Sequence, residues 1–302
     1  MFGLDNVNQY IDWWHEALPG SGEGFDHEGT LASVVLSPTL TIGLSNYWNF
    51  TLGQSIGNRN MTWDGDTTTI HHRDESTGSN FKNAEGGIMG DTRLMFRYLV
   101  FNDGQGAGKR WFLGSGLVIP SKNTLTSDPF SLGREGKVHR HFSISEGVYK
   151  GLLEMQYFKK QMINPVFIGG TIMAELPINK NNYGYTASQL YDLSLTVFSK
   201  LIPAISGSLG GSLIARHTTE AYWNGVAAPN SRATVITIGG GVLWDTKIGG
   251  VSLNIQKPFF VSGAFSGIEG DVDQRVDAWQ VSLSYRRLLN IMIPWIGPLK
   301  DV

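Results

Sequence analysis

The sequence predicts an all-β fold: a transmembrane antiparallel β-barrel of about 12 strands, with short periplasmic turns and long extracellular loops. Three observations support this class. Apolar and polar residues alternate with a period of two, the alternating segments are long, and short and long connections follow each other along the chain. A soluble β-sandwich or lipocalin-like barrel would explain the alternation but neither the strand length nor the loop asymmetry.

Period-two alternation is clearest in residues 92–100 and 279–286. Because successive side chains of a strand point to opposite faces, Leu94, Phe96 and Tyr98 share one face and Arg93 and Arg97 the other. The polar faces are largely Ser, Thr, Gly and Asn, whereas a solvated exterior would carry more charge. We therefore expect the apolar faces to meet lipid. On the last segment these are Trp279, Val281, Leu283 and Tyr285.

Eleven segments alternate in this way, at about 32–44, 47–59, 88–101, 110–120, 143–159, 165–177, 188–200, 203–217, 232–245, 248–260 and 274–288. Most have 11–15 residues. Strands of globular proteins usually have about 5–6, whereas a tilted strand that crosses a bilayer needs about 9–11. The length therefore supports the membrane barrel independently of the alternation.

The connections alternate between short and long. The short ones are Ser45-Asn46, Asn102 to Lys109, Gln161 to Asn164, Leu201-Ile202 and Thr246-Lys247; the long, polar ones are 60–87, 121–142, 178–187, 218–231 and 261–273. Outer-membrane barrels have short periplasmic turns and long extracellular loops. We expect the same orientation here, with the C-terminus in the periplasm.

Eleven is an odd number, while bacterial single-chain barrels have an even number of strands. A first strand within residues 1–30, at about Asn6–Trp14, would restore the parity, although this segment could instead form a helical turn, a plug or an interfacial anchor. A strand at Leu289–Ile296 is the alternative, which Pro294 disfavours. We expect the N-terminal strand, a single domain over residues 1–302, and a C-terminal tail at 289–302.

Composition excludes several other classes. The 24 Lys and Arg against 26 Asp and Glu give a net charge of −2, which argues against nucleic-acid binding. The chain has no Cys, so it has no disulfide, zinc–thiolate site or cysteine nucleophile. Residues 1–30 contain neither the basic nor the apolar region of a signal peptide, so we interpret the sequence as a mature chain of a bacterial outer membrane. No nucleotide-binding motif is visible, and we expect no cofactor.

Four motifs, in order, resemble a known family. Gly90-Asp91-Thr92-Arg93-Leu94-Met95-Phe96-Arg97-Tyr98 resembles the GDxRLxxRY strand of outer-membrane transporters linked to the meta-pathway of phenol degradation, which are relatives or analogues of FadL-type channels. Similar matches are Gly116–Ser121, Glu175–Tyr185, and Asn254–Pro258 followed by Trp279–Arg287, so that the resemblance covers about residues 30–288.

The resemblance implies a passive channel for small, hydrophobic or aromatic solutes. We expect a solute to meet aromatic loop residues first and then to pass through the lumen or leave sideways between two strands, as FadL-like relatives are thought to do. Gly239–Gly241, which lack side chains to hold neighbouring strands, are our candidates for such a gap. The aromatic loop residues are Trp63, Phe130, Tyr183, Tyr222 and Trp223.

Five charged residues fall on the polar faces of predicted strands: Arg93, Arg97, Glu154, Glu175 and Arg286. An arginine that faces lipid near the midplane costs about 2–4 kcal/mol, so we expect all five to point into the lumen. Two roles are compatible there. The residues could fill the barrel as an ion-pair network, or they could line a solute path.

Two further groups of residues are candidates for chemistry. His141 and Ser143 could share a strand face as in an outer-membrane phospholipase, but the required Asn is replaced by Met155, so we expect no catalytic residues and no enzyme. His71, His72, Asp74 and Glu75 in one loop and His139 and His141 in another could bind a metal. Adjacent His71 and His72 are poorly placed to chelate one ion, so we interpret these loops as solvated and assign no metal.

A second functional hypothesis is a non-transporting barrel that anchors a larger membrane assembly. Its possible protein contacts are the N-terminal segment around Trp13-Trp14 and the tail Leu289–Val302, which is rich in apolar residues. In either case the expected partners include the lipid bilayer, and in the first case a small-molecule solute; no nucleic acid is expected.

Overall fold

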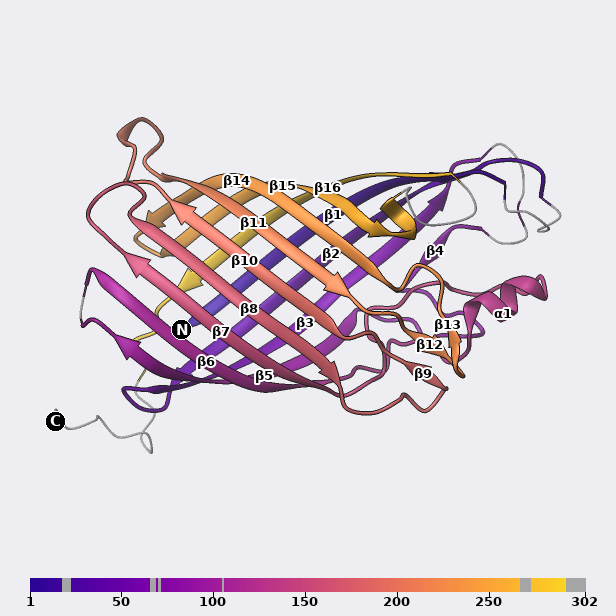
Figure 1. Ribbon diagram of the computed structural model, residues 1–302, viewed down its shortest axis with the longest axis horizontal. Helices are drawn as coiled ribbons and strands as arrows, with labels where there is room; N and C mark the ends of the chain where they lie inside the picture. The colour runs from indigo at the N-terminus through magenta and orange to yellow at the C-terminus, as the bar shows by residue number, and fades with distance from the viewer. Residues whose placement is uncertain (18–22, 66–68, 70–71, 105, 267–272, 292–302) are drawn as a thin grey trace.

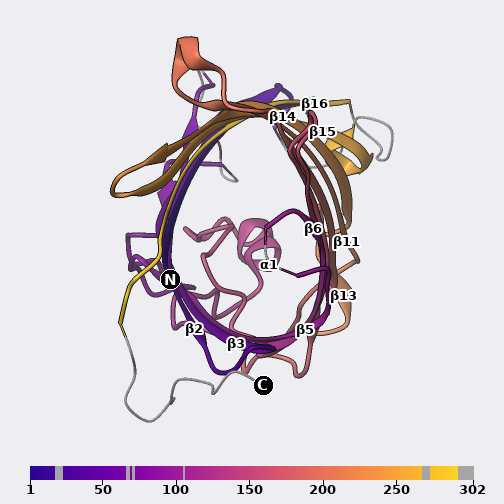
Figure 2. The same cartoon turned by 90° about the vertical axis from the view of Figure 1, so that its left-hand side faces the viewer.

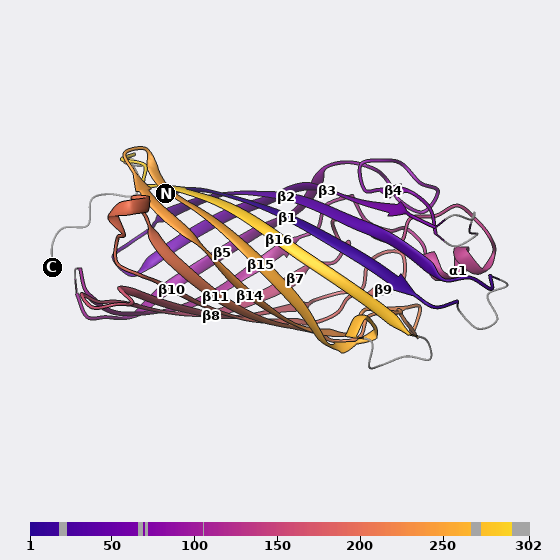
Figure 3. The ribbon, with the colours of Figure 1, turned by 90° about the horizontal axis from the view of Figure 1, so that it is seen from above.

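Twelve long antiparallel strands form a closed wall in the computed structural model, which describes residues 1–17, 23–65, 69, 72–104, 106–266 and 273–291 (Figures 1 and 2). Each wall strand pairs with the wall strands next to it along the chain, and β1 closes the wall by pairing with both β2 and β16, which lie on either side of it in Figure 3. The wall strands are β1 (Phe2–His15), β2 (His27–Gly43), β3 (Trp48–Trp63), β5 (Met89–Asn102), β6 (Gly108–Ile119), β7 (Lys150–Lys160), β8 (Phe167–Pro177), β10 (Leu190–Phe198), β11 (Ser208–Thr218), β14 (Ala233–Thr246), β15 (Gly249–Gly263) and β16 (Gln274–Arg287).

The predicted barrel is confirmed, and the missing strand is the N-terminal one. β1 pairs from Phe2↔Arg287 to His15↔Gln274 on one side and with β2 on the other. Each of the eleven predicted segments overlaps one wall strand. The alternative strand at Leu289–Ile296 lies mostly outside the described residues.

Two predicted strands begin too early. Residues 203–207 belong to a turn, and β11 begins only at Ser208; residues 143–149 belong to a loop, and β7 begins only at Lys150. Gly147 has a φ of 70° and donates its N–H to Ser145 Oγ, 3.0 Å away. The Ser145 N–H in turn donates to the Asn123 carbonyl. These backbone groups are committed to loop contacts and cannot join a ladder.

Short turns lie at one end of the barrel and long connections at the other. The start of β1 and the end of β16 lie side by side at the short-turn end, on the left of Figure 1. The short turns comprise residues 44–47, 103–107, 161–166, 199–207 and 247–248. The turn at 199–207 contains the 3₁₀ helix η1 (Pro203–Ile205). The remaining wall strands are joined at the opposite end, which we call the mouth.

The long loops fold together into a cap over part of the mouth. The cap contains β4 (Glu75–Ser76), which pairs with β3, the helix α1 (Pro129–Arg134), and a small sheet of β9 (Tyr185–Thr186), β12 (Tyr222–Trp223) and β13 (Val226–Ala227). Figure 2 shows α1 inside the outline of the barrel when it is viewed from the short-turn end. None of the helices in the described part of the chain has the length and apolarity needed to cross a membrane.

The outer face of the wall is apolar and carries aromatic residues toward the short-turn end. Phe96 and Leu283 are 44% and 47% exposed. Trp48 packs on Tyr98, and Trp111 on Tyr157, each with ring centroids 4.9 Å apart. Aromatic girdles of this kind mark the membrane interface of barrels.

β1 departs from the apolar exterior at mid-height. Its outward residues Asn6 and Asn8 stand opposite the outward Leu283 and Val281 of β16. Asn8 Nδ2 donates to Asn6 Oδ1 at 2.5 Å, so each amide satisfies part of the other. This pair explains why the first strand shows no clear alternation.

We predict that the two faces tolerate charge differently. Leu283→Arg, on the outer face of β16, should lower the free energy of unfolding by about 2–4 kcal/mol. Ser282→Arg, on the inner face of the same strand, is the matched control and should cost far less because its guanidinium meets lumen groups. Urea unfolding in lipid vesicles measures both, and equal losses would contradict the assignment of faces.

Candidate functional site

One half of the inner wall is lined by ion pairs. Arg97 on β5 donates to Glu154 on β7, with Nε 2.5 Å from Oε1 and Nη2 3.1 Å from Oε2. Arg93 on β5 donates from Nη2 to Glu175 Oε1 on β8. Neither pair joins adjacent strands, so the side chains meet across the concave face of the wall. The arrangement places four of the five predicted charges inside the barrel.

Space for this network comes from glycine. A Cβ added at Gly114 of β6 would lie 3.1 Å from Glu154 Oε1 and 3.2 Å from Met95 Sδ. Met95 itself packs with Val118 and Leu152 in a buried cluster on the same inner face. Lys150 Nζ, 3.8 Å from Glu175 Oε2, extends the network toward the mouth. This half of the wall is thus packed and charged.

The opposite half of the inner wall is lined mainly by small and neutral polar residues. Gln280 Nε2 donates to Gln256 Oε1 at 2.5 Å, and Gln256 Nε2 donates to Ser212 Oγ at 3.3 Å. The strand register places further small residues on the same inner face. They are Ser194, Thr196, Ser208, Gly210, Thr237, Gly239, Gly241, Ser252, Ser282 and Ser284.

Arg286, the fifth predicted charge, lies apart from the other four. Its Nη2 donates to Asp5 Oδ2 at 2.7 Å, across the β1–β16 seam near the short-turn end. Asp5 was not among the residues predicted from the sequence. It lies an even number of positions from the other inward-facing residues of β1, which would have indicated its place on the inner face. The pair between Arg216 and Asp192, whose atoms are 2.9 Å apart on β11 and β10, was likewise not predicted.

The wall is continuous at the glycines that we expected to open. Gly239, Gly240 and Gly241 pair with β11 on one side and with β15 on the other. Gly239 and Gly241 allow close packing, since a Cβ at Gly239 would lie 2.5 Å from Gln256 Cγ and one at Gly241 even closer to the Leu253 carbonyl oxygen. The expected gap at this position is therefore wrong.

The ladder is interrupted elsewhere, at the mouth end of the β15–β16 seam. Pairing between these strands runs from Gly250↔Arg286 to Gln256↔Gln280, and no ladder pair joins them beyond that point in the described ranges. An ion pair between Lys257 and Asp277 crosses the seam on the outside, and Lys257 Nζ lies 4.5 Å from the Trp279 ring centroid. The 3₁₀ helix η2 (Ala264–Ser266) packs against both strands.

Two of the expected aromatic solute contacts belong to the interior of the cap. Trp223 is 5% exposed and belongs to a small core, against which Phe130 and Tyr185 also pack. This core joins three loops that are distant in sequence, through Ala84, Leu125, Ala221, Trp223 and Ala228, and Tyr185 adds a fourth. Burial, together with Glu146, raises the pKa of the Tyr185 hydroxyl. Tyr183 remains 46% exposed.

A fully buried arginine ties two of these loops together. Arg140 donates from Nη1 to the Thr77 and Ser79 carbonyls at 3.1 and 3.2 Å, and from Nη2 to Asn123 Oδ1 at 3.0 Å. Its backbone exchanges two hydrogen bonds with the Asn83 side chain. Burial lowers the pKa of the Arg140 guanidinium from its ordinary value.

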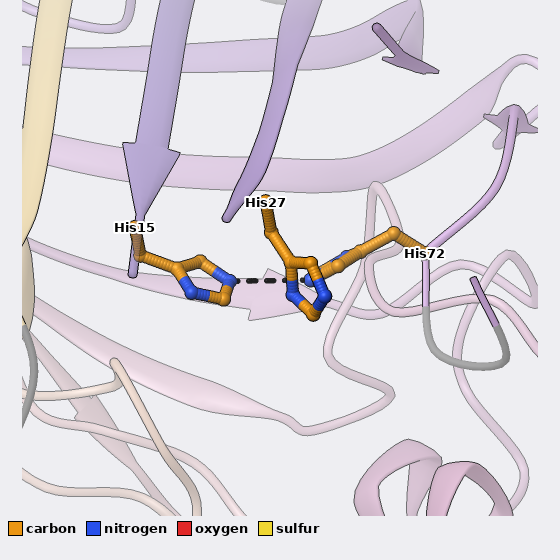
Figure 4. A group of neighbouring side chains, drawn as sticks. All are labelled: His15, His27 and His72. Atoms are coloured by element: carbon orange, nitrogen blue, oxygen red, sulfur yellow. Dashed lines mark hydrogen bonds between the residues drawn. The ribbon is translucent and has the colours of Figure 1, made fainter. Parts of the chain in front are cut away.

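Five of the seven histidines of the chain gather on one side of the mouth. His15 and His27 stand directly opposite each other on β1 and β2, and His72 comes from the loop after β3 (Figure 4). His72 then contacts His141, and His141 contacts His139. The sequence analysis named the three loop histidines but missed His15 and His27, whose contact depends on the β1–β2 register. His71 lies outside the described residues.

The other loop candidates have structural partners. Asp74 accepts from the Trp63 N–H, and Glu75 accepts from both the backbone and Nδ1 of His141. Ser143 donates its hydroxyl to the Ser145 carbonyl. His141 and Ser143 lie in a loop rather than on one strand face, so their predicted strand geometry is wrong.

His139 and His141 form a hydrogen-bonded chain. His139 Nδ1 donates to the Lys137 carbonyl at 2.6 Å, which leaves Nε2 as an acceptor for His141 Nε2 at 2.9 Å. Burial lowers the pKa of His139, with His141 and Arg73 acting in the same direction. The neutral imidazole is therefore the form that fits this loop.

Comparison with known proteins supports the fold. No family model matches the sequence, and no curated protein has a significantly similar sequence. An outer-membrane channel from Pseudomonas putida F1 is similar in structure, with a TM-score of 0.59, 15% identity and coverage of 94% of each chain. The NanC porin has a TM-score of 0.44 at 10% identity, covering 94% of this chain and 99% of its own. A TodX monoaromatic hydrocarbon channel mutant has 0.43 at 10%, with 96% and 90% covered.

We predict that the Arg97–Glu154 pair is strongly coupled. Arg97→Met leaves the Glu154 carboxylate, whose side chain is 6% exposed, without its partner. Breaking a buried pair in this way costs about 3–5 kcal/mol. The double variant Arg97→Met with Glu154→Leu should recover most of the loss. Urea unfolding of both variants tests this, and an additive double variant would contradict the coupling.

We also predict that the cap loosens in acid. The pKa of His139 is lower in the folded protein than in the unfolded chain, so the unfolded state binds more protons and stability falls as the pH drops through about 6.5. Protonation also removes the lone pair that accepts from His141. Tryptic cleavage after Lys137, relative to cleavage after Lys247 at the far end, should rise between about pH 7.5 and 5.5. His139→Asn should abolish this rise, and an unchanged rise would contradict the prediction.

Proposed function

We propose that this protein is a passive outer-membrane channel for small, hydrophobic or aromatic solutes. The observation that carries the proposal is the uneven inner wall, charged and packed on β5–β8 but lined mainly by small residues on β10–β16. An eight-stranded barrel is just wide enough for its side chains to fill. A twelve-stranded barrel with small residues on half of its wall leaves room for a passage along that half.

The fold and the motifs support an outer-membrane location and the solute class. The P. putida protein of similar fold is an outer-membrane channel. The solute class rests on the motifs around Arg93 and Arg97 and on the closing strand. Arg93, Arg97, Glu154 and Glu175 would act mainly by holding one wall rigid, so that the path runs beside them rather than through them. Arg286 would hold the β1–β16 seam through Asp5.

The interrupted β15–β16 seam is the proposed exit for an apolar solute. A polar lumen gives such a solute little reason to cross the whole barrel, whereas an opening in the wall leads directly into the hydrocarbon layer. Lys257 and Asp277 lie across the seam, and their contact would have to open for passage.

The first test is entry of N-phenyl-1-naphthylamine, a small apolar aromatic dye that fluoresces in membranes, into bacterial cells that produce the protein. We expect entry to be several-fold faster than in cells without the protein. Equal rates would reject the channel.

The second test closes the seam. The chain has no native Cys, so Lys257→Cys with Asp277→Cys can be joined by a short bis-maleimide without background. We expect this cross-link to return dye entry to the level of cells without the protein. A matched control joins Lys257→Cys to Ile238→Cys, which are partners on the continuous β14–β15 seam, and should leave entry unchanged. Equal entry in both cross-linked proteins would place the exit elsewhere.

A second candidate function is an anchor in a larger membrane assembly, which the polar Asn6–Asn8 pair on the outer face of β1 favours. Amide groups in hydrocarbon are costly and pack well against another protein. The two tryptophans of the predicted N-terminal contact have different surroundings. Trp13 packs among the mouth histidines, whereas the Trp14 ring centroid lies 5.0 Å from Arg275 Cζ. A photo-cross-linker attached at Asn8→Cys in native membranes that labels only lipid would argue against an anchor.

A further inference from the structure

We propose that His15, His27 and His72 form a binding site for a divalent transition metal ion of the Zn²⁺ type at the mouth of the barrel. One ligand nitrogen from each imidazole lies within 4.8 Å of the others (Figure 4). Two of the ligands stand on the rigid wall and the third on the loop after β3. The proposal does not depend on the solute path.

The spacing of the nitrogens fits tetrahedral coordination. His15 Nε2 and His72 Nε2 are 3.3 Å apart. Two nitrogens that each lie about 2.0–2.1 Å from one zinc ion at the tetrahedral angle are separated by about 3.3–3.4 Å. The structure also records this contact as a hydrogen bond between the two rings, and a bound ion would take its place (Figure 4). The pair is therefore positioned as two ligands of one ion would be.

The tautomer of His15 is fixed in the form that binds metal. Its Nδ1 lies 2.7 Å from the Glu16 carbonyl, which can only accept, so Nδ1 carries the hydrogen. The lone pair is consequently on Nε2, which faces His72. Metal-binding histidines almost always donate their other ring N–H to such an outer acceptor, which fixes the ring orientation.

His27 provides the independent sign of a ligand. Its side chain is completely buried, and within the described residues neither ring nitrogen makes a hydrogen bond. Buried polar groups without a hydrogen bond are rare, because each costs its full desolvation energy. Nε2 lies 3.3 Å from Glu23 Oε2, an ion pair only when the ring is protonated, and makes no hydrogen bond there. A metal ion would satisfy the nitrogen of the neutral ring, and Glu23 is a candidate for a fourth ligand.

Aromatic rings enclose the site, and its imidazole ligands limit the choice of ion. Trp63 stacks on His72 at 5.7 Å with an interplanar angle of 8°, Trp13 lies 4.9 Å from the same ring, and Phe25 lies 5.3 Å from His27. These contacts hold the imidazoles against rotation. Imidazole ligands without thiolates suit Zn²⁺, Cu²⁺ and Ni²⁺ rather than Ca²⁺ or Mg²⁺.

The neighbouring His139–His141 pair is a less suitable site. Its nitrogens are 2.9 Å apart, as in a hydrogen bond, and Glu75 already occupies His141 Nδ1. This pair is nevertheless connected to the proposed site, because Glu75, the partner of His141, lies three residues after His72 in the chain between β3 and β5. A metal ion held by His72 would fasten the root of this loop to β1 and β2, beside the cap.

Calorimetry of the full folded chain in detergent, stripped with EDTA and titrated with Zn²⁺, tests the proposal. We expect one ion per chain. His15→Ala, His27→Ala and His72→Ala should each weaken binding at least about 100-fold, since even an outer-shell partner is worth about 10–100-fold. His139→Ala and His217→Ala are matched controls that should bind as the parent does. The visible spectrum of bound Co²⁺ should be intense, as four-coordinate sites give, and should weaken with His27→Ala.

Limited proteolysis gives a second readout that does not require the wall variants to fold. Zn²⁺ should slow tryptic cleavage after Arg73, next to His72, and leave cleavage after Lys247 unchanged. His72→Ala, a loop variant, should abolish the protection. Binding that survives His72→Ala and His27→Ala, or that disappears with His139→Ala, would overturn the assignment, as would the absence of saturable binding to the folded parent.

Discussion

The structure depends on one constraint: in hydrocarbon, every backbone N–H and C=O must find its partner within the protein. A sheet meets this requirement only if it has no free edge, and here β1 removes the edge by pairing over its whole length on both sides. The inside and outside of the wall follow from closure, since alternate side chains then face lipid or lumen. The interrupted β15–β16 seam is notable for this reason, because both strands continue toward the mouth there without a ladder pair among the described residues.

Closure also determines where charge can be placed. Arg93, Arg97, Glu154 and Glu175 meet across two or three strands because the concave face brings distant strands together. The same curvature gathers loops at the mouth, where Arg140 and the small core around Trp223 connect them. Different interactions thus stabilise the two parts. The wall is held by a ladder of backbone hydrogen bonds, and the cap is held by buried side chains that connect its loops.

Sequence reasoning recovered the eleven regular strands because lipid on one face imposes a strict two-residue period. It predicted β1, at about Asn6–Trp14, from the parity of the strand count and not from alternation, since Asn6 and Asn8 face outward and Trp13 faces inward, against the usual pattern. The strand itself runs from Phe2 to His15. Sequence reasoning placed Arg97 and Glu154 on the inner face, but their pairing depends on shear and register that no local pattern contains. His15 and His27 escaped notice for the same reason. The expected opening at Gly239–Gly241 was wrong because missing side chains also permit closer packing, which is what Gly239 and Gly241 do.

The pairing of β1 with β16 has a consequence for assembly. Asp5 and Arg286 are 281 positions apart, so this contact joins nearly the two ends of the chain. Contacts of such high sequence separation form slowly, because the chain loses the entropy of closing a long loop before the contact contributes any favourable energy. The first strand to emerge must wait, with one edge unpaired, until the last has been made. Until then that edge is open to other strands, and a chain that ends before β16 would present it as a template for unwanted strand pairing.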